Sequence, residues 1–313
     1  MTTPDQIPDT PAPATPAPRR PPPPVPVTVL TGFLGAGKTS LLNRLLADPE
    51  LADTAVLINE YGEIGLDHLF VREVEEGVVL LSSGCLCCTV RGELVSALED
   101  LLRGLDNKRL PPFSRVMIET TGLADPAPIL HTLMSHPYLS LRYRLDGVVC
   151  VVNAVNGAAT LDAQEEAVKQ VAMADRIVLT KTDLVGPEGQ EALGDLKARL
   201  KRLAPAAPLL DAAAGEADAA HVLGAGLYDP GRKIPDVARW LAAEEVAAAA
   251  EAEAGACAVE PPRHDDRIRA FTLATDAAIP AATLDLFLEL LRATYGANLL
   301  RMKAIVKVKE NPD

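Results

Sequence analysis

The sequence predicts an α/β fold in which a doubly wound, mostly parallel sheet is followed by a smaller, shortened α+β domain. Short apolar runs of strand length alternate with helical stretches, which is typical of parallel sheets covered by helices. Hydrophobic residues make up 48% of the chain but aromatic residues only 4%, so the core must consist of Ala, Val, Leu and Ile. With 313 residues, the chain is long enough for one large and one smaller domain.

Seven Val- and Leu-rich runs are the expected strands of this sheet. Right-handed crossovers between parallel strands would place the intervening helices on both of its faces. The runs span residues 25–32, 54–60, 77–84, 114–122, 146–154, 176–183 and 207–212.

Composition divides the chain into four parts. Residues 1–26 are rich in Pro, Ala and Thr and are predicted to be disordered or to form polyproline II. Residues 27–212 contain the seven strands, and the Ala- and Glu-rich residues 213–262 are predicted to form a linker with partial helix. Residues 263–313 form the C-terminal domain, which ends on a strand with an open edge and is therefore expected to be incomplete. Its predicted elements are a strand at 267–275, a helix at 284–294 and a strand at 299–310.

The charge and hydropathy of the chain exclude several classes of partner. Its net charge of -13 repels phosphate backbones and anionic lipids. No apolar run reaches the roughly 18–20 residues that cross a bilayer. The proline-rich start also lacks the apolar segment of a signal peptide. We therefore expect a cytoplasmic protein that binds neither nucleic acid nor membranes.

Residues 32–39 match the phosphate-loop pattern G-x-x-x-x-G-K-[ST] between a predicted strand and an amphipathic helix. In such a loop, backbone amides and the helix N-terminus face the phosphates. Lys38 would neutralise the outer phosphates, and Thr39 would hold magnesium. The alternative is a glycine-rich turn without a ligand. The candidate binding residues are Gly32, Gly35, Ala36, Gly37, Lys38, Thr39 and Ser40.

An acidic residue, Glu119, ends the fourth strand. Phosphate-loop enzymes place a carboxylate there to hold magnesium or its water. Thr120, Thr121 and Gly122 follow as a turn of small residues suited to sensing phosphate. The alternative is a carboxylate that only caps the strand.

The sixth strand ends in Thr180, Lys181, Thr182 and Asp183, close to the N-K-x-D signature of guanine recognition. An aspartate there accepts two hydrogen bonds from guanine, and adenine cannot supply them, so GTP is favoured over ATP. Thr180 stands where asparagine is usual. The alternative is a strand followed by a helix-capping aspartate.

Three cysteines, Cys85, Cys87 and Cys88, follow the third strand. Thiolates are soft ligands that suit zinc, copper(I) or cobalt, and three of them leave a tetrahedral ion one ligand short, which favours exchange. The fourth donor could be water, Glu60, Glu63 or a group on a recipient protein. A redox pair and a chance cluster of buried thiols are the alternatives. Because parallel strands bind ligands at their carboxyl ends, we expect this motif to share an edge with the phosphate loop.

Five segments occur in the chain in the order TGFLGAGKTSLLNRLL, LINEYGEIGLDH, GCLCCTVRGEL, ETTGLADPAPI and TKTDL. In this combination they resemble the CobW-like GTPases, which include cobalamin-biosynthesis proteins, nitrile hydratase activators and zinc chaperones. The similarity covers residues 27–185 and is weaker from residue 265 onward. Relatives often carry a histidine-rich stretch before a longer C-terminal domain, whereas here His264 alone stands near that place.

The resemblance implies a GTPase domain, a metal ion at the cysteine motif and GTP-linked delivery of zinc or cobalt to a client metalloprotein. Lys38 would then stabilise transition-state charge, Thr39 and Glu119 would hold magnesium, and Glu60 or Glu63 would link a switch segment to metal or water. Two other functions stay open: a metal buffer or thiol sensor with a degenerate phosphate loop, and a small-molecule kinase. The oligomeric state, monomer or homodimer, also stays open.

Overall fold

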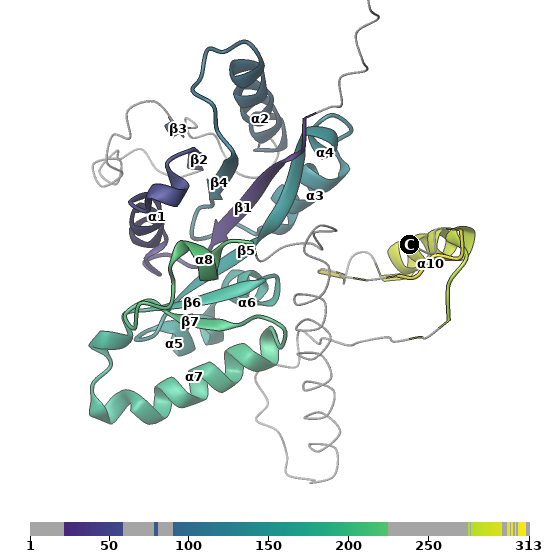
Figure 1. Cartoon of the computed structure of the whole chain (residues 1–313). Coiled ribbons are helices and arrows are strands. Elements are labelled where there is room, and N and C mark those ends of the chain that lie inside the picture. The colour runs from purple at the N-terminus through teal and green to yellow at the C-terminus, as the bar shows by residue number, and fades with distance from the viewer. Residues whose placement is uncertain are drawn as a thin grey trace, which may run out of the picture.

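A seven-stranded sheet forms the centre of the computed structural model (Figure 1). The structure describes residues 22–58, 78–80, 90–224, 275, 277–295, 299–300, 302, 304 and 306–310. The strand order is β3-β2-β4-β1-β5-β6-β7, and every pairing between these strands is parallel. The predicted α/β fold is confirmed. The strands are β1 (Val25–Thr31), β2 (Thr54–Ile58), β3 (Val78–Leu80), β4 (Arg115–Glu119), β5 (Tyr143–Asn153), β6 (Arg176–Thr180) and β7 (Leu209–Asp211).

In the described part of the chain, helices lie between successive strands, apart from the β2–β3 connection, which is outside the described residues. The α-helices are α1 (Lys38–Leu46), α2 (Val90–Asp106), α3 (Ala127–Ser135), α4 (Leu139–Arg142), α5 (Gly157–Ala163), α6 (Glu165–Ala172), α7 (Gln190–Leu203), α8 (Ala219–Val222) and α10 (Ala281–Tyr295). Short 3₁₀ helices are η1 (Pro49–Leu51), η3 (Thr182–Leu184) and η4 (Pro187–Gly189).

Successive side chains of a strand point to opposite sides of the sheet, so each strand contributes to the core on both faces. In β1, Val27 and Val29 join the cluster beneath α2, α3 and α4, whereas Leu30 joins the cluster beneath α1 and α8. A third cluster packs β5 and β6 against α5, α6 and α7. Continuous apolar runs in the sequence therefore mark strands covered on both sides.

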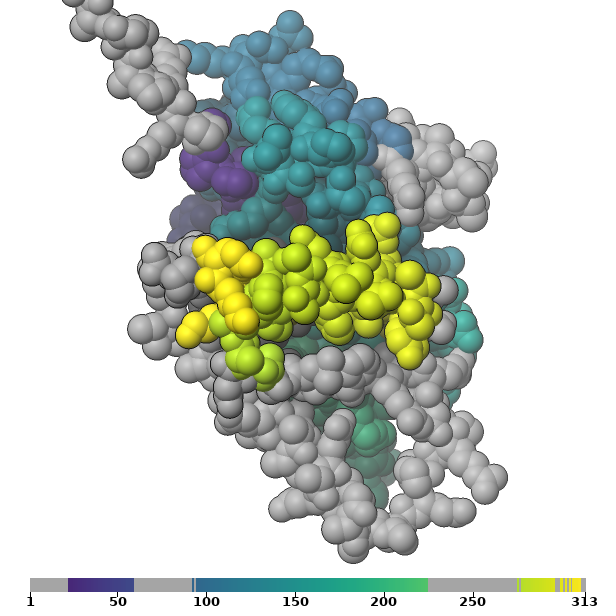
Figure 2. Space-filling model, turned by 90° about the vertical axis from the view of Figure 1, so that its right-hand side faces the viewer, coloured from purple at the N-terminus to yellow at the C-terminus, as the bar shows by residue number. Residues whose placement is uncertain are grey.

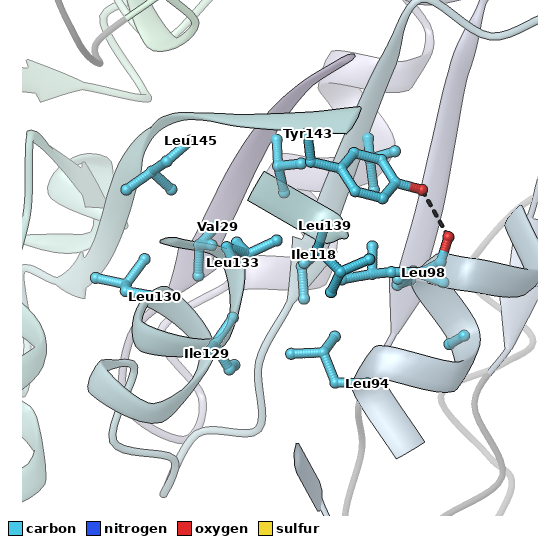
Figure 3. Packing of buried hydrophobic residues seen from close by; sticks show 14 of the residues in the cluster. Val29, Leu94, Leu98, Ile118, Ile129, Leu130, Leu133, Leu139, Tyr143 and Leu145 are labelled. Atoms are coloured by element: carbon cyan, nitrogen blue, oxygen red, sulfur yellow. Dashed lines mark hydrogen bonds between the residues drawn. The ribbon is translucent and has the colours of Figure 1, made fainter. Parts of the chain in front are cut away.

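Tyr143 is the one tyrosine of the first cluster among the described residues, and its polar end is satisfied. Its hydroxyl donates to the backbone oxygen of Leu98 in α2 at 2.9 Å (Figure 3). Burial raises the pKa of Tyr143 above its ordinary value, so the hydroxyl stays neutral. Figure 3 shows its ring among Leu98, Leu139 and Ile118, which join strands to α2 and α4.

A partly buried ion pair, Arg115 with Asp146, closes the amino-terminal edge of the sheet. Asp146 accepts hydrogen bonds from Arg115 Nη1, from Thr28 Oγ1 at 3.2 Å and from the amide of Gly224 at 3.0 Å. It lies where the register of β1 against β5 shifts. The Asp146 carboxylate thereby links β1, β4 and β5 to Gly224, the last described residue before position 275.

The large domain extends beyond residue 212, where the sequence analysis places its end. Ala217, Ala219, Val222 and Leu223 are buried in the cluster beneath α1 and α8. These residues share the Ala-rich composition of the following segment, so the sequence carried no sign that they pack. Residues 1–21 and 225–274, which hold most of the predicted tail and linker, lie outside the described residues.

In the described part of the C-terminal region, α10 includes the predicted helix at 284–294. None of its residues is buried, and its side chains stand at the surface in Figure 2, in yellow. Of the strand predicted at 267–275, all but Thr275 lies outside the described residues. In the strand predicted at 299–310, Val308 forms an isolated parallel bridge with Ile279. Leu300 packs against the first core cluster. Among the described helices, none has the length and apolar character that crossing a membrane would need.

Replacing Asp146 tests how far the ion pair stabilises the fold. Asp146→Ala leaves the charge of Arg115, whose side chain is 21% exposed, without its partner. We expect the free energy of unfolding in urea to fall by about 3 kcal/mol. Asp100→Ala is the matched control, because the Asp100–Arg103 pair is exposed on both sides and should cost about 0.5 kcal/mol or less. Equal losses in the two variants would contradict this role.

Candidate functional site

The phosphate loop, residues 32–39, leaves β1 and enters α1 at the carboxyl edge of the sheet. Its first residue crosses β5 so closely that a Cβ on Gly32 would lie 2.3 Å from the backbone oxygen of Val151. Gly37 precedes α1 with φ +94°, a left-handed conformation that favours glycine. The motif's first and last glycines are therefore fixed by space and by backbone conformation.

The side chain of Lys38 lies across the loop. Its Nζ donates to the backbone oxygens of Gly32 at 2.9 Å and Phe33 at 3.4 Å, and the residue is 9% exposed. Lys38 is also the first residue of α1, so its charge adds to the partial positive charge of the helix N-terminus. This end of the loop is suited to an anion.

Thr39 and Glu119 meet beside the loop. The Thr39 hydroxyl donates to Glu119 Oε1 at 2.7 Å, and Glu119 is 5% exposed. Glu119 ends β4, where it pairs in register with Leu30 of β1. A hydroxyl and a carboxylate are the hard oxygen donors that Mg²⁺ prefers, so this donor set fits magnesium.

The 120–124 loop continues from Glu119 and stays against the phosphate loop. The Thr120 amide donates to the backbone oxygen of Leu30 at 2.9 Å, and the Thr120 hydroxyl donates to Thr31 Oγ1 at 3.0 Å. The pairing of β4 with β1 thus continues past Glu119. A Cβ on Gly122 would lie 2.6 Å from the amide nitrogen of Leu34. The buried Thr121 hydroxyl has no hydrogen-bond partner among the described residues.

The base segment, residues 180–183, is hydrogen-bonded directly to the phosphate loop. Thr180 Oγ1 donates to the backbone oxygen of Ala36 at 2.6 Å, and Lys181 Nζ donates to that of Gly35 at 3.1 Å. The threonine that departs from the usual asparagine therefore anchors the loop through its hydroxyl. Asp183, in η3, is exposed.

Sequence analysis missed a second loop, residues 211–217, beside the base segment. Asp211 accepts from Thr182 Oγ1 at 2.6 Å and from two backbone amides, those of Ala213 and Ala214. Partial burial raises the pKa of Asp211, but the hydrogen bonds from Thr182 and these amides outweigh it and hold the pKa below its ordinary value. An aspartate ending the last strand at this same edge was the available signal.

Arg44 of α1 holds the 211–217 loop from the other side. Its Nη1 donates to Ala212 O at 2.8 Å and its Nη2 to Ala217 O at 2.9 Å. One helix thus contacts both the phosphate loop and the 211–217 loop. No pattern in the sequence indicates this contact, because an exposed arginine on a helix is usually solvated.

The cysteine motif cannot be placed, since Cys85, Cys87 and Cys88, like Glu60 and Glu63, lie outside the described residues. Within the described ranges, no group of three or more His, Cys, Asp or Glu side chains could hold a metal ion. Cys150, which is described, is buried in β5, and burial raises the pKa of its thiol to about 12. It is a neutral core residue.

A family model for the CobW/HypB/UreG nucleotide-binding domain matches residues 26–211. The chain belongs to the CobW/HypB/UreG family. The match spans all seven strands of the sheet and includes the cysteine motif at 85–88. Arg44 and Gln170, which the sequence analysis did not single out, also lie within this CobW/HypB/UreG domain.

Several characterised proteins are similar to this CobW/HypB/UreG member. The zinc chaperone YjiA of Escherichia coli is 43% identical over 195 residues, which are 62% of this chain and 59% of the relative. The zinc-regulated GTPase metalloprotein activator 1 of Schizosaccharomyces pombe is 37% identical over 202 residues, 62% of this chain and 47% of the relative. The crystal structure of Zn(II)-bound YjiA GTPase from E. coli matches with a TM-score of 0.51 and 35% identity, covering 64% of this chain and 62% of that one. The chain therefore spans less than two thirds of each.

Alanine at Gly32 tests the close crossing of the phosphate loop over β5. The new Cβ would collide with the rigid backbone of Val151. Overpacking of this kind costs about 1–3 kcal/mol, and we expect Gly32→Ala to weaken GDP binding by about tenfold or more in calorimetric titrations. Gly92→Ala in α2, where nothing lies within 4 Å of the added Cβ, is the control and should bind like the wild type. Unchanged affinity in Gly32→Ala would contradict the assigned loop geometry.

Proposed function

We propose that this chain is a GTP-hydrolysing metallochaperone that binds zinc or cobalt at its cysteine motif and delivers the ion to a client metalloprotein. The observation that carries the nucleotide part is the direct bonding of the base segment to the phosphate loop through Thr180 and Lys181. Phosphate recognition and base recognition would thereby take place at one connected site. The metal part is supported by family membership and by the printed names of the relatives.

Hydrolysis in this proposal depends on positioning and charge, with no covalent intermediate. Lys38 and the amides of Gly35, Ala36 and Gly37 would stabilise the charge that develops on the phosphate oxygens. Thr39 and Glu119 would hold magnesium, which when bound neutralises charge on the outer phosphates. Ser40, exposed on the first turn of α1, would contact the phosphate chain. Glu60 or Glu63 would link the segment after β2 to metal or water.

Specificity for guanine is assigned to Asp183. Its exposed carboxylate would accept two hydrogen bonds from the base, and ATP would leave it unpaired. The 211–217 loop borders this position, because Thr182 next to Asp183 is bonded to Asp211.

The cysteine motif is connected to the nucleotide edge by short pieces of chain. Ile58 of β2 pairs with Glu119 of β4, and Leu80 of β3 pairs with Ile58. Cys85 follows Leu80 by five residues, so covalent geometry keeps their Cα atoms within about 18 Å. Cys88 precedes the first residue of α2 by two residues, a span of about 7 Å at most. These limits support an ion site that can respond to the nucleotide.

Phosphate release separates GTP hydrolysis from the alternatives. Wild type is expected to release phosphate from GTP much faster than from ATP. Replacing Lys38 with an uncharged residue should lower kcat for GTP by about 100-fold or more, because its positive charge no longer stabilises the phosphate oxygens. Asp183→Ala should reduce the preference for GTP over ATP by about 100-fold, because two hydrogen bonds to a charged acceptor are lost. Equal rates with ATP and GTP in the wild type would support a kinase-like or degenerate site instead.

Zinc affinity in two nucleotide states tests delivery. The wild type is titrated with zinc and with cobalt in the presence of a non-hydrolysable GTP analogue and, separately, of GDP. We expect a nucleotide-dependent difference of about 5-fold or more, the usual range of coupling between sites. The triple variant Cys85→Ala, Cys87→Ala, Cys88→Ala should lose both the tight binding and the difference. Tight binding that ignores the nucleotide would identify a metal buffer.

A further inference from the structure

A glutamine in α6 is fully buried at a place where the core is otherwise apolar. Gln170 is 0% exposed, and its neighbours Ala167, Val168 and Val171 pack into the third cluster. Long amide side chains are mostly exposed in folded proteins, and a buried one must find hydrogen-bond partners. Its contacts therefore indicate what it does.

Both donors of the Gln170 amide go to the 120–124 loop. Nε2 donates to the backbone oxygen of Gly122 at 3.1 Å and to that of Ala124 at 3.0 Å. Two carbonyl acceptors define which end of the amide is nitrogen. A second, weaker contact between the same elements is the half-exposed ion pair of Lys169 with Asp125, at 3.9 Å.

The loop held by Gln170 borders the expected position of the terminal phosphate. It begins directly after Glu119, and Gly122 touches the phosphate loop at the backbone of Leu34. The phosphate loop would hold the outer phosphates of a bound triphosphate, and Thr39 and Glu119 beside it would hold the magnesium ion that neutralises their charge. Gln170 therefore fixes a segment that would contact GTP and that GDP, without the third phosphate, would not reach.

The Gln170 side chain also lies beside a cavity. Gln170 Oε1 is buried without a hydrogen-bond partner among the described residues. The residue Gln170 lines a cavity of about 350 Å³ between the phosphate loop, the end of β5 and helices α5 and α6, together with Phe33, Asn153 and Thr160. A buried acceptor without a partner is costly. The side chain is thus placed for its two donors, at the expense of its acceptor.

We infer that Gln170 is a positioning residue for GTP hydrolysis: its amide holds the 120–124 loop against the phosphate loop, so that the loop meets the terminal phosphate in the reactive geometry. This inference rests on the proposed GTPase function. Loss of the two hydrogen bonds frees the loop and leaves the phosphate loop, the base segment and the Thr39–Glu119 pair untouched. A variant without these hydrogen bonds should therefore bind and hydrolyse GTP less well while its affinity for GDP stays unchanged.

The test compares the wild type with Gln170→Met, Gln170→Asn and the control Lys169→Met, which removes the weak ion pair on the same helix. GDP affinity, affinity for a non-hydrolysable GTP analogue, and kcat and KM for GTP are measured for each. For Gln170→Met we expect unchanged GDP affinity, weaker analogue binding and a kcat lowered about 10- to 100-fold, as for a misplaced reacting group. Gln170→Asn, one methylene shorter, should be intermediate, and Lys169→Met should behave like the wild type.

Gln170→Glu adds a pH profile that a purely structural residue would not produce. The neutral acid can donate one hydrogen bond to the loop, whereas the ionised form can donate none. Burial raises the pKa of a carboxyl group, so kcat of this variant, relative to the wild type, should fall as pH rises from roughly 6 to 8.

Three results would overturn the inference. The first is a folded Gln170→Met variant with the kcat of the wild type. The second is a loss of GDP affinity equal to the loss of analogue affinity. The third is failure of both Gln170→Met and Gln170→Asn to fold, which would make the amide a structural group. Failure of the proposed function looks different, because the wild type itself would then hydrolyse no GTP. The ratio of analogue to GDP affinity would still test Gln170 in that case.

Discussion

The hydrogen bond between Thr39 and Glu119 is the contact on which the rest of the site depends. It joins the first turn of α1 to the end of β4 at a distance of 2.7 Å. That distance is possible because β1 pairs with β4 on one side and with β5 on the other, which sets the start of the phosphate loop over the sheet edge. This placement requires glycine at position 32, since any side chain there would collide with β5.

Around this contact, hydrogen bonds tie separate connections into one rigid edge. The base segment bonds to the phosphate loop through Thr180 and Lys181. The 211–217 loop is hydrogen-bonded to the base segment through Asp211, and Arg44 of α1 donates hydrogen bonds to the same loop. Gln170 fastens the remaining loop, 120–124, to α6. Each connection is short and polar, and each lies at the carboxyl end of a parallel strand, where open α/β sheets bind their ligands.

The strands and the phosphate loop could be predicted from the sequence because both depend on local pattern. A strand buried on both faces is a continuous apolar run, and the loop needs glycine, lysine and threonine at fixed spacing. Arg44 and Gln170 could not be predicted, since their roles depend on partners more than 25 positions away in the chain. Asp211 could be noticed because it ends a predicted strand at this edge, but its contact with Thr182, 29 positions away, could not be derived from local pattern. The packed residues 217–223 were missed for a related reason: alanine-rich sequence is equally compatible with a linker and with a small helix that fills a gap.

The measurement that tests this account most directly is a double-mutant cycle between Thr39→Val and Glu119→Gln, with GDP affinity determined at saturating magnesium and again with EDTA. If both side chains act on one ion, each single variant loses most of the magnesium-dependent gain in affinity and the double variant loses no more. With EDTA, all four proteins should bind GDP with similar affinity. Independent, additive losses that persist in EDTA would contradict the account, because the two side chains would then act separately and without the ion.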